Sequence, residues 1–431
     1  MTATIATAQA MLLQHVDPEI KDQIDMDVVL EDIARTQSEG NAEGVTVDMQ
    51  NNKFEIVSKT SGMTAYAGGE GASIIYSDAG LDKMFTTPKF VTAAFKIGHE
   101  VLAATLKDRA ALERLVDMYS LEIRKAIMRA KAQHLRSNGS GIISILPAGV
   151  QTGTAITVSG KAAGTIVSGA KYNLGTQWIQ EGQELEFGTE ADFAAATTIA
   201  GIVDNVDSAT QITLTSSVTV GASVGANNRG GTNAATWYVR LKGTYGNTPM
   251  GLLGLIDDGT LSGVTSIQDK VRATTPYMKS AVLVKANKTT IIKDFRTLYT
   301  MVRQSNRMPK YFKVSQDVYD AYTDAITITS QSNPGNAQYK TKLGTGHTGL
   351  MFSYGQEPIP ILLDEFLPYG TVLLMDPAFL FCADLFADAF LPDAILTRIS
   401  GTKFYETIRA AYYNFGTYSA KKLGGQLHYE S

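Results

Sequence analysis

Cysteine is nearly absent from this sequence, whose 431 residues include only Cys382. One cysteine cannot form an intrachain disulfide, and it cannot supply the several thiolates of a typical structural zinc site. Cys382 stands in the apolar run FLFCADLF, where we expect a buried small hydrophobic side chain. The chain must therefore fold by burying its own apolar surface, which its length permits. A reducing compartment is expected.

Charged residues are also few, at 19% of the chain, and the net charge is −4 at pH 7. A protein that mainly grips nucleic acid usually carries a basic excess, so we expect DNA affinity to be at most a local feature. No apolar stretch approaches the roughly 20 residues that span a bilayer. The first residues, MTATIATAQAMLLQH, lack the charged start of a signal peptide. We therefore expect no membrane partner and synthesis in the cytoplasm.

Motifs for catalysis are missing as well. The sequence lacks the phosphate-binding pattern G-x-x-x-x-G-K-[ST]. His99 and Glu100 begin a zinc-protease pattern, but Ala103 stands where the second histidine is needed. These absences favour a protein that is not an enzyme and has no cofactor and no metal.

One enzyme-like pattern is present, because the segment 344–349 reads GTGHTG and Asp364 follows 20 residues after Gly344. This spacing resembles a dinucleotide-binding fingerprint. The residues before it are polar where a buried strand is needed, and LMFSYGQEP after it is too short for the helix that would hold the pyrophosphate. A flexible loop is the preferred interpretation, and a dinucleotide-dependent enzyme is an alternative.

The strongest pattern in the chain predicts a long helix from residue 108 to about residue 137. Apolar side chains recur there at the i, i+3, i+4 spacing of one buried stripe. They are Leu112, Leu115, Val116, Tyr119, Ile123, Ala126, Ile127 and Ala130. Asp108 is a suitable N-cap, and Asn138-Gly139 supplies a stop. At 1.5 Å per residue, such a helix is roughly 45 Å long.

The second half of this helix is basic, with no acidic residue after Glu122. Its cations are Arg124, Lys125, Arg129, Lys131 and Arg136. Cations near a helix C-terminus are stabilised by the helix dipole, by about 0.3–1 kcal/mol each. The dipole alone is the preferred explanation, and contact with DNA phosphates is the alternative.

Residues 53–97 predict two strands around a glycine-rich tip. KFEIVSKT forms the first strand, and the alternating residues 90–97 form the second. Between them, Gly68, Gly69 and Gly71 exclude regular structure. Because an isolated pair of strands is marginally stable in water, we expect a neighbouring molecule to pack against it. The residues expected at that contact are Tyr66, Gly68, Gly69, Gly71 and Phe90.

The remaining segments differ in composition. Residues 1–45 carry short amphipathic pieces and suggest an arm that lies on another surface. Residues 146–246 are rich in Gly, Thr and Val and contain repeated short strand-like runs, which predicts an inserted all-β domain. From residue 247 to 431 helices and strands alternate, and a turn is expected at Leu367-Pro368-Tyr369-Gly370. The overall fold class is therefore α+β.

The order of these parts resembles the major capsid proteins of tailed phages, whose shell fold is named for phage Hong Kong ninety-seven. The passage AYAGGEGAS followed by IGHEVLAATLKDRAALERLVDMYSLEIRKAIMRAKAQHL is similar to the family's entry from extended loop to long helix. NTPMGLLGLIDD and LLDEFLPYGTVLLMDPAFLF resemble later segments of the same fold.

The resemblance implies five parts. They are an N-terminal arm (1–45), an extended E-loop (46–100), a P-domain with the long spine helix (101–145), the inserted β-rich domain (146–246), and an A-domain with the remaining P-domain strands (247–431). It also implies self-assembly through hexamers and pentamers into the icosahedral shell of a virion. Non-specific packaged double-stranded DNA and scaffold, portal and decoration proteins are expected partners. The alternatives are an encapsulin-like compartment and a carbohydrate- or surface-binding structural protein.

Overall fold

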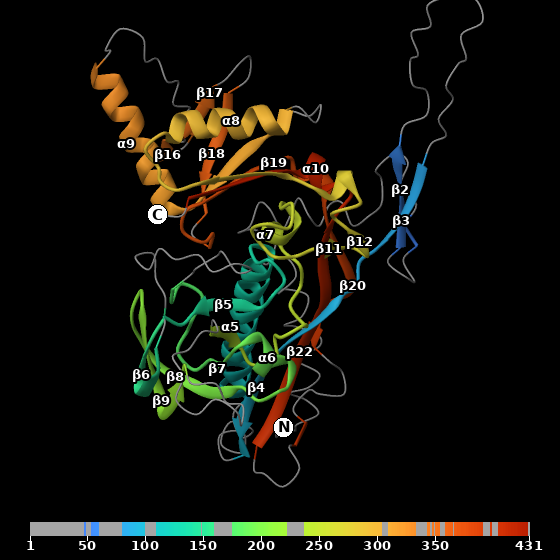
Figure 1. The fold of residues 1–431 in the computed structure, drawn as a ribbon. Helices are drawn as coiled ribbons and strands as arrows, with labels where there is room; N and C mark the ends of the chain where they lie inside the picture. The colour runs from blue at the N-terminus through green and yellow to red at the C-terminus, as the bar shows by residue number, and fades with distance from the viewer. Residues whose placement is uncertain are drawn as a thin grey trace, which may run out of the picture.

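The computed structural model describes a mixed α+β chain in which strands outnumber helices (Figure 1). The described residues are 47–48, 53–59, 80–99, 109–147, 149–158, 175–221, 237–303, 309–332, 343–344, 347–348, 350–353, 358–364, 366–390, 397–398 and 404–429. The expected arm, 1–45, lies outside them, as do Tyr66, Gly68, Gly69 and Gly71. The predicted α+β class is confirmed.

The expected names P-domain, A-domain and inserted domain are kept below only as labels for parts of the chain. A long antiparallel sheet and one long helix form the part labelled the P-domain (Figure 1). Strand β4 (Lys89–Gly98) pairs along its whole length with β22 (Phe404–Thr417). Strands β20 (Leu380–Phe390) and β21 (Thr397–Arg398) also pair with β22. Helix α5 (Arg109–Leu135) packs against β4 and covers one face of this sheet. In the described part of the chain, α5 thus covers one face of the sheet, and the opposite face carries the exposed Phe90; we call it the open face.

Helix α5 has 27 residues and confirms the predicted long helix. Its buried stripe includes Ile123 and Ile127. Ala126, which was expected on that stripe, is exposed, and this prediction was wrong. The reason is that only one side of the helix meets the sheet, so the buried stripe is narrow and Met118 and Leu121 also remain exposed.

The A-domain is a six-stranded sheet with two helices on one face. Its strand order is β13-β23-β19-β14-β18-β17. The strands are β13 (Ala281–Lys285), β14 (Tyr311–Val314), β17 (Leu350–Ser353), β18 (Pro358–Leu363), β19 (Thr371–Met375) and β23 (Gly424–Tyr429). Helices α8 (Ile291–Arg303) and α9 (Gln316–Ser332) share a core with the sheet around Phe295, Phe312 and Phe352.

The expected turn at 367–370 is present between β18 and β19. The N–H of Thr371 donates to the carbonyl of Pro368 at 3.2 Å, and Gly370 has φ 75°. A positive φ at this position is typical of a type II turn and favours glycine. A side chain at position 370 would also collide with the carbonyl of Tyr429.

The inserted domain is a second six-stranded sheet, with strand order β5-β10-β7-β8-β9-β6. Its strands are β5 (Ile142–Ile145), β6 (Gln151–Thr157), β7 (Glu184–Gly188), β8 (Ile199–Ser208), β9 (Gln211–Val220) and β10 (Tyr238–Leu241). A short helix, α6 (Glu190–Ala194), follows β7. Both tryptophans, Trp178 and Trp237, lie in its core. The sheet begins at Ile142, slightly before the predicted boundary at 146.

The glycine-tipped hairpin has a different second strand from the one expected. Strand β2 (Lys53–Lys59) pairs with β3 (Gly80–Phe85) and with the short β1 (Val47–Asp48). The strand that was expected to complete the hairpin is β4, which instead pairs with β22. Residues 86–88 separate β3 from β4. The alternating pattern of residues 90–97 therefore predicted strand β4 correctly, but the partner expected for this strand was wrong.

The GTGHTG segment does not have the structure of a dinucleotide fingerprint. Strands β15 (Leu343–Gly344) and β16 (His347–Thr348) pair with each other, and β17 follows where the fingerprint requires a helix. Residues 345, 346 and 349 lie outside the described residues. Asp364 accepts hydrogen bonds from two basic side chains. The dinucleotide interpretation has no structural support.

Candidate assembly site

The root of the β2–β3 hairpin is held by side chains from distant parts of the sequence. Gln268 Nε2 donates to Thr86 Oγ1 at 3.0 Å, and Asn414 Nδ2 donates to the carbonyl of Thr87 at 2.7 Å. Lys89 Nζ donates to the carbonyl of Gly246 at 2.8 Å. Thr86 is buried. These contacts fix the point at which the hairpin leaves the body of the subunit, and we call them the root clamp.

Gln268 occupies an unusual turn between β11 (Ser266–Ile267) and β12 (Lys270–Val271). Gln268 and Asp269 have φ values of 51° and 60°, so both central residues of this two-residue hairpin are left-handed. Asn-Gly or Asp-Gly is the usual choice for such a turn. The Gln268 amide offsets this strain, because its oxygen also accepts from the N–H of Thr417 at 3.3 Å.

Asn414 completes the root clamp from strand β22. Its Oδ1 accepts from the N–H of Met250 at 2.7 Å and from the N–H of Phe415 at 2.9 Å. One amide therefore joins β22, the chain returning from the inserted domain and the residues after β3. Sequence reasoning missed both Gln268 and Asn414, because no local pattern marks an amide whose partner is far away in the chain.

Asp364 joins the end of the spine helix to the A-domain sheet. Arg136 Nε donates to both carboxylate oxygens at 2.7 Å, and Lys313 Nζ donates at 3.0 Å. The side chains of Arg136 and Asp364 are 6% and 2% exposed. Burial by itself raises the pKa of Asp364, but Arg136 and Lys313 outweigh it and hold the pKa below the ordinary value. Asp364 is therefore an ionised carboxylate at neutral pH.

Arg136 was a candidate for contact with DNA, and the structure corrects this prediction. Besides Asp364, it donates from Nη1 to the carbonyl of Ala132 at 2.9 Å and lies over the ring of Phe366 at 5.2 Å. A buried, ion-paired guanidinium cannot reach phosphates on the outside of the subunit. Its role is to connect two domains.

The other basic residues of the helix are divided between different surroundings. Lys125 is exposed. Lys131 Nζ lies 5.3 Å from the ring centre of Tyr413. Arg129 is half-buried against Gln180, and burial lowers its pKa. The side chain of Arg124 lies outside the described residues. The described members of this set thus differ in exposure: Lys125 is exposed, Arg129 and Lys131 are half-buried, and Arg136 is buried.

The inserted domain is attached to the same junction. Trp178 Nε1 donates to the carbonyl of Phe366 at 3.2 Å, and Gln133 Nε2 donates to the carbonyl of Trp178 at 3.4 Å. Phe366 also packs against the core of the inserted domain. The residues 364–366 therefore touch the spine helix, the A-domain and the inserted domain.

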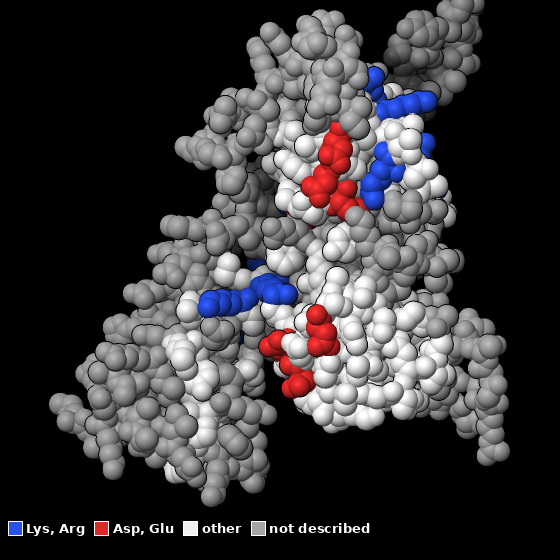
Figure 2. Space-filling model, turned by 90° about the vertical axis from the view of Figure 1, so that its left-hand side faces the viewer, with Lys and Arg blue, Asp and Glu red and all other residues white. Residues whose placement is uncertain are grey.

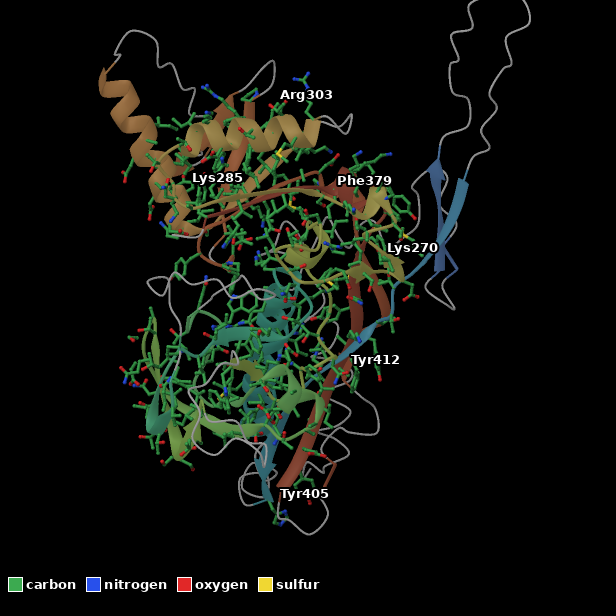
Figure 3. The ribbon with its side chains drawn as sticks, in the orientation of Figure 1. Lys270, Lys285, Arg303, Phe379, Tyr405 and Tyr412 are labelled. Atoms are coloured by element: carbon green, nitrogen blue, oxygen red, sulfur yellow. The ribbon has the colours of Figure 1, made fainter. Side chains whose placement is uncertain are left out.

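Phe90, the remaining candidate contact residue, lies on the open face of the long sheet. Its ring is 4.4 Å from that of Tyr412, and Phe90 is 46% exposed. Figure 3 shows Tyr412 on the outer side of β22. Phe90 is thus well placed for contact with another molecule, although it belongs to the sheet and not to the hairpin.

On the covered face, His134 of helix α5 contacts Tyr413 of β22. His134 Nδ1 and the Tyr413 hydroxyl are 2.7 Å apart. Burial lowers the pKa of His134 from 6.5 to about 4. The histidine is therefore neutral at physiological pH and serves to join helix and sheet.

Two features are absent from the described residues: a cluster of metal ligands and a membrane-spanning helix. No group of three or more His, Cys, Asp and Glu side chains there could hold a metal ion. No helix in the described part of the chain is both long enough and apolar enough to cross a membrane.

No protein-family model matches the sequence, and no curated protein matches it. The similar solved structures are those of phage capsids and related particles. A chain of the cyanophage A-1(L) capsid asymmetric unit has 9% identity, 87% coverage of both chains and a TM-score of 0.43. A chain of Mycobacterium phage Patience has 9% identity, covers 100% of this chain and 91% of that chain, and has a TM-score of 0.39.

A chain from the capsid of the native GTA particle has 9% identity, covers 88% of this chain and 84% of that chain, and has a TM-score of 0.38. Each of these TM-scores is below 0.5. The function proposed below therefore rests on the geometry of this chain.

Proposed function

We propose that this chain is the major capsid protein of a tailed phage, a subunit that assembles with copies of itself into an icosahedral shell around double-stranded DNA. The observation that carries the proposal is the isolated sheet β1-β2-β3. It is separate from the other sheets of the described chain, and Figure 1 shows it standing apart from the body. Among the described residues no other strand pairs with these three short strands, and a sheet of that size buries little apolar surface by itself, so a neighbouring subunit is the natural source of further contacts.

The division of the subunit supports the same proposal. The parts labelled A-domain, P-domain and inserted domain meet at Asp364 and Phe366 through hydrogen bonds, of which the one between Arg136 and Asp364 is buried. Because its parts are fixed to one another, the body keeps the same shape in every copy, as hexamers and pentamers of a closed shell require. The inserted domain would then lie on the outer surface of the shell. The finished protein would be located in the virion, after assembly in the host cytoplasm.

Further partners belong to the proposal. A shell of this kind is built with a scaffold and a portal, and decoration proteins can bind its outside. Contact with packaged DNA would be non-specific and would involve phosphates. Of the basic helix residues, Lys125 is the exposed candidate for that contact.

The test is to replace residues 62–79 at the hairpin tip with a short Gly-Ser linker. The body of the subunit should keep its fold, because the strand ends and the root clamp remain, and circular dichroism checks this. Assembly, followed by light scattering and negative-stain electron microscopy, should fail or yield shells that dissociate at lower temperature. Fully stable shells from the shortened chain would contradict the role of the hairpin, and a wild-type chain that stays monomeric would contradict the proposed function.

A further inference from the structure

Helix α8 presents a basic face to the outside of the A-domain. Lys293, Arg296 and Arg303 are exposed, whereas the helix's one acidic residue, Asp294, is buried. Asp294 is occupied inside the domain, where it accepts a hydrogen bond from Thr290 at 3.0 Å. Figure 3 shows Arg303 projecting from the end of α8 away from the sheet. The exposed face of this helix therefore carries cations without an acidic residue of its own.

Helix α9 presents an acidic face. It contains three aspartates and neither lysine nor arginine. Asp320 and Asp324 are exposed, whereas Asp317 is buried and pairs with Lys288 at 3.0 Å. Figure 2 shows a group of acidic side chains beside a group of basic ones on the upper part of the molecule. In Figure 1, α8 crosses the top of the sheet and α9 stands at its side, so the two charged faces belong to separate helices of the same domain.

Each face carries like charges at neighbouring positions of its helix. Asp320 and Asp324 are four residues apart, and Lys293 and Arg296 are three apart. Like charges at these spacings destabilise a helix by about 0.2–0.5 kcal/mol per pair. A partner of opposite charge would turn this repulsion into attraction. Lys293 and Arg303 are separated by roughly 15 Å along the helix, enough to span both acidic residues of a facing α9.

We propose that the α8 face of one subunit binds the α9 face of the next copy, in a head-to-tail contact that repeats around each ring. This inference rests on the proposed function. The two faces belong to separate helices of one chain and carry opposite charges, so the α8 face of one copy can meet the α9 face of the next copy, as a heterologous contact requires. The charges also disfavour wrongly docked copies, because a contact between two α8 faces or between two α9 faces would place like charges opposite each other.

The test uses two charge-reversed variants of the full chain. In the α8 variant Lys293→Glu is combined with Arg303→Glu, and in the α9 variant Asp320→Lys is combined with Asp324→Lys. Each variant alone should lower the assembled fraction about tenfold at low salt, because like charges then face each other across the contact. Raising the salt to about 1 M, where the screening length is about 3 Å, should remove most of the difference. The assembled fraction is measured by sedimentation velocity.

Two rescues identify the partner of each face. A chain that carries all four substitutions should assemble like wild type, since its faces are complementary again. A 1:1 mixture of the α8 and α9 variants should recover hexamers, because the two variants can alternate around a six-membered ring, whereas a five-membered ring would keep one like-charged contact. Recovery by the four-substitution chain without recovery of hexamers by the mixture would place the attraction within one subunit and overturn the proposal.

A matched control is Lys279→Glu with Lys422→Glu, which changes the net charge by the same amount at two other exposed lysines. This control should assemble normally. If neither rescue restored assembly, the α8 face would serve another anionic partner, such as DNA, and the proposal would be wrong. Normal assembly of both single-face variants at low salt would also overturn it while leaving the proposed function intact. A wild-type chain that does not assemble would contradict both the proposed function and this inference.

Discussion

At the scale of single residues, the subunit depends on a few buried polar side chains that act between domains. Asp364 and Arg136 are 228 residues apart in the sequence and form one ion pair. From the sequence, Arg136 belongs to a basic helix end, and Asp364 belongs to an apparent dinucleotide motif. Neither local pattern predicts the ion pair, because the partner that determines the role of each residue is supplied only by the fold.

Replacing Asp364 with Asn should destabilise the subunit strongly. The substitution leaves Arg136 buried without its counter-charge, which typically costs about 3–5 kcal/mol. Denaturant unfolding measures the change. The control is Glu184→Gln, which breaks an ion pair of similar length, 2.7 Å, between side chains that are 41% and 54% exposed. That change should cost less than about 1 kcal/mol, and equal losses in the two variants would contradict the role given to Asp364.

His134 should make the stability of the subunit depend on pH. Its pKa is about 4 in the folded chain against 6.5 ordinarily, so the unfolded chain binds a proton more readily between these values. Stability should therefore fall as the pH drops from 6.5 to about 4 and change no further from this residue below that. The loss attributable to His134 is up to about 3 kcal/mol.

The measurement is chemical unfolding at a series of pH values, for wild type and for His134→Gln, which cannot take up a proton in this range. The carboxylates of Asp317 and Asp364, whose pKa values are lowered in the fold, contribute acid sensitivity to both chains. The difference between the two curves isolates the histidine. Parallel curves between pH 6.5 and 4 would show that His134 is not responsible.

At the scale of elements, the sequence predicts what depends on neighbours along the chain. The i, i+3, i+4 pattern located helix α5, and glycine in the Leu367–Gly370 turn has a local conformational reason. Strand partners depend on distant residues, and so β4 was assigned to the hairpin although it pairs with β22. The root clamp could not be predicted at all, since its amides stand in segments with no recognisable motif.

The strained turn at Gln268-Asp269 allows a paired prediction about the root clamp. Asp269→Gly should leave stability unchanged or raise it by up to about 1 kcal/mol, because glycine adopts a positive φ without strain. Gln268→Gly relieves the same kind of strain but removes the amide that binds Thr86 and Thr417. This variant should be less stable, with faster hydrogen exchange at residues 80–89. Similar exchange in both variants would contradict the clamp.

At the scale of the whole molecule, the sequence suggests an order of parts but not the contacts that join them. The change of composition near residues 146 and 246 predicted an inserted domain, and the described strands from Ile142 to Leu241 form their own sheet and core. Its attachment through Trp178 and Phe366 carries no local signal, because one partner is a backbone carbonyl.

A fragment of residues 142–246 should fold alone. Its core lies within the fragment apart from the contact with Phe366, so the loss of stability should be limited to that contact and the exposed ring of Trp178. Well-dispersed amide signals in a proton–nitrogen NMR spectrum are the expected result. A collapsed spectrum would mean that the domain is stable only when it is attached to the spine helix and the A-domain.

The root clamp holds one end of the β2–β3 hairpin, so a small rotation there moves the other end by a larger distance. Six steps along β2, at about 3.4 Å each, place the end of that strand roughly 20 Å beyond the strand's start. A rotation of about 10° at the root would then move that end by about 3–4 Å, which is the length of one residue along a strand. The pairing between the hairpin and a neighbouring molecule would then shift by one residue. In the proposed shell, two amide side chains near Thr86 would therefore set how accurately adjacent subunits meet.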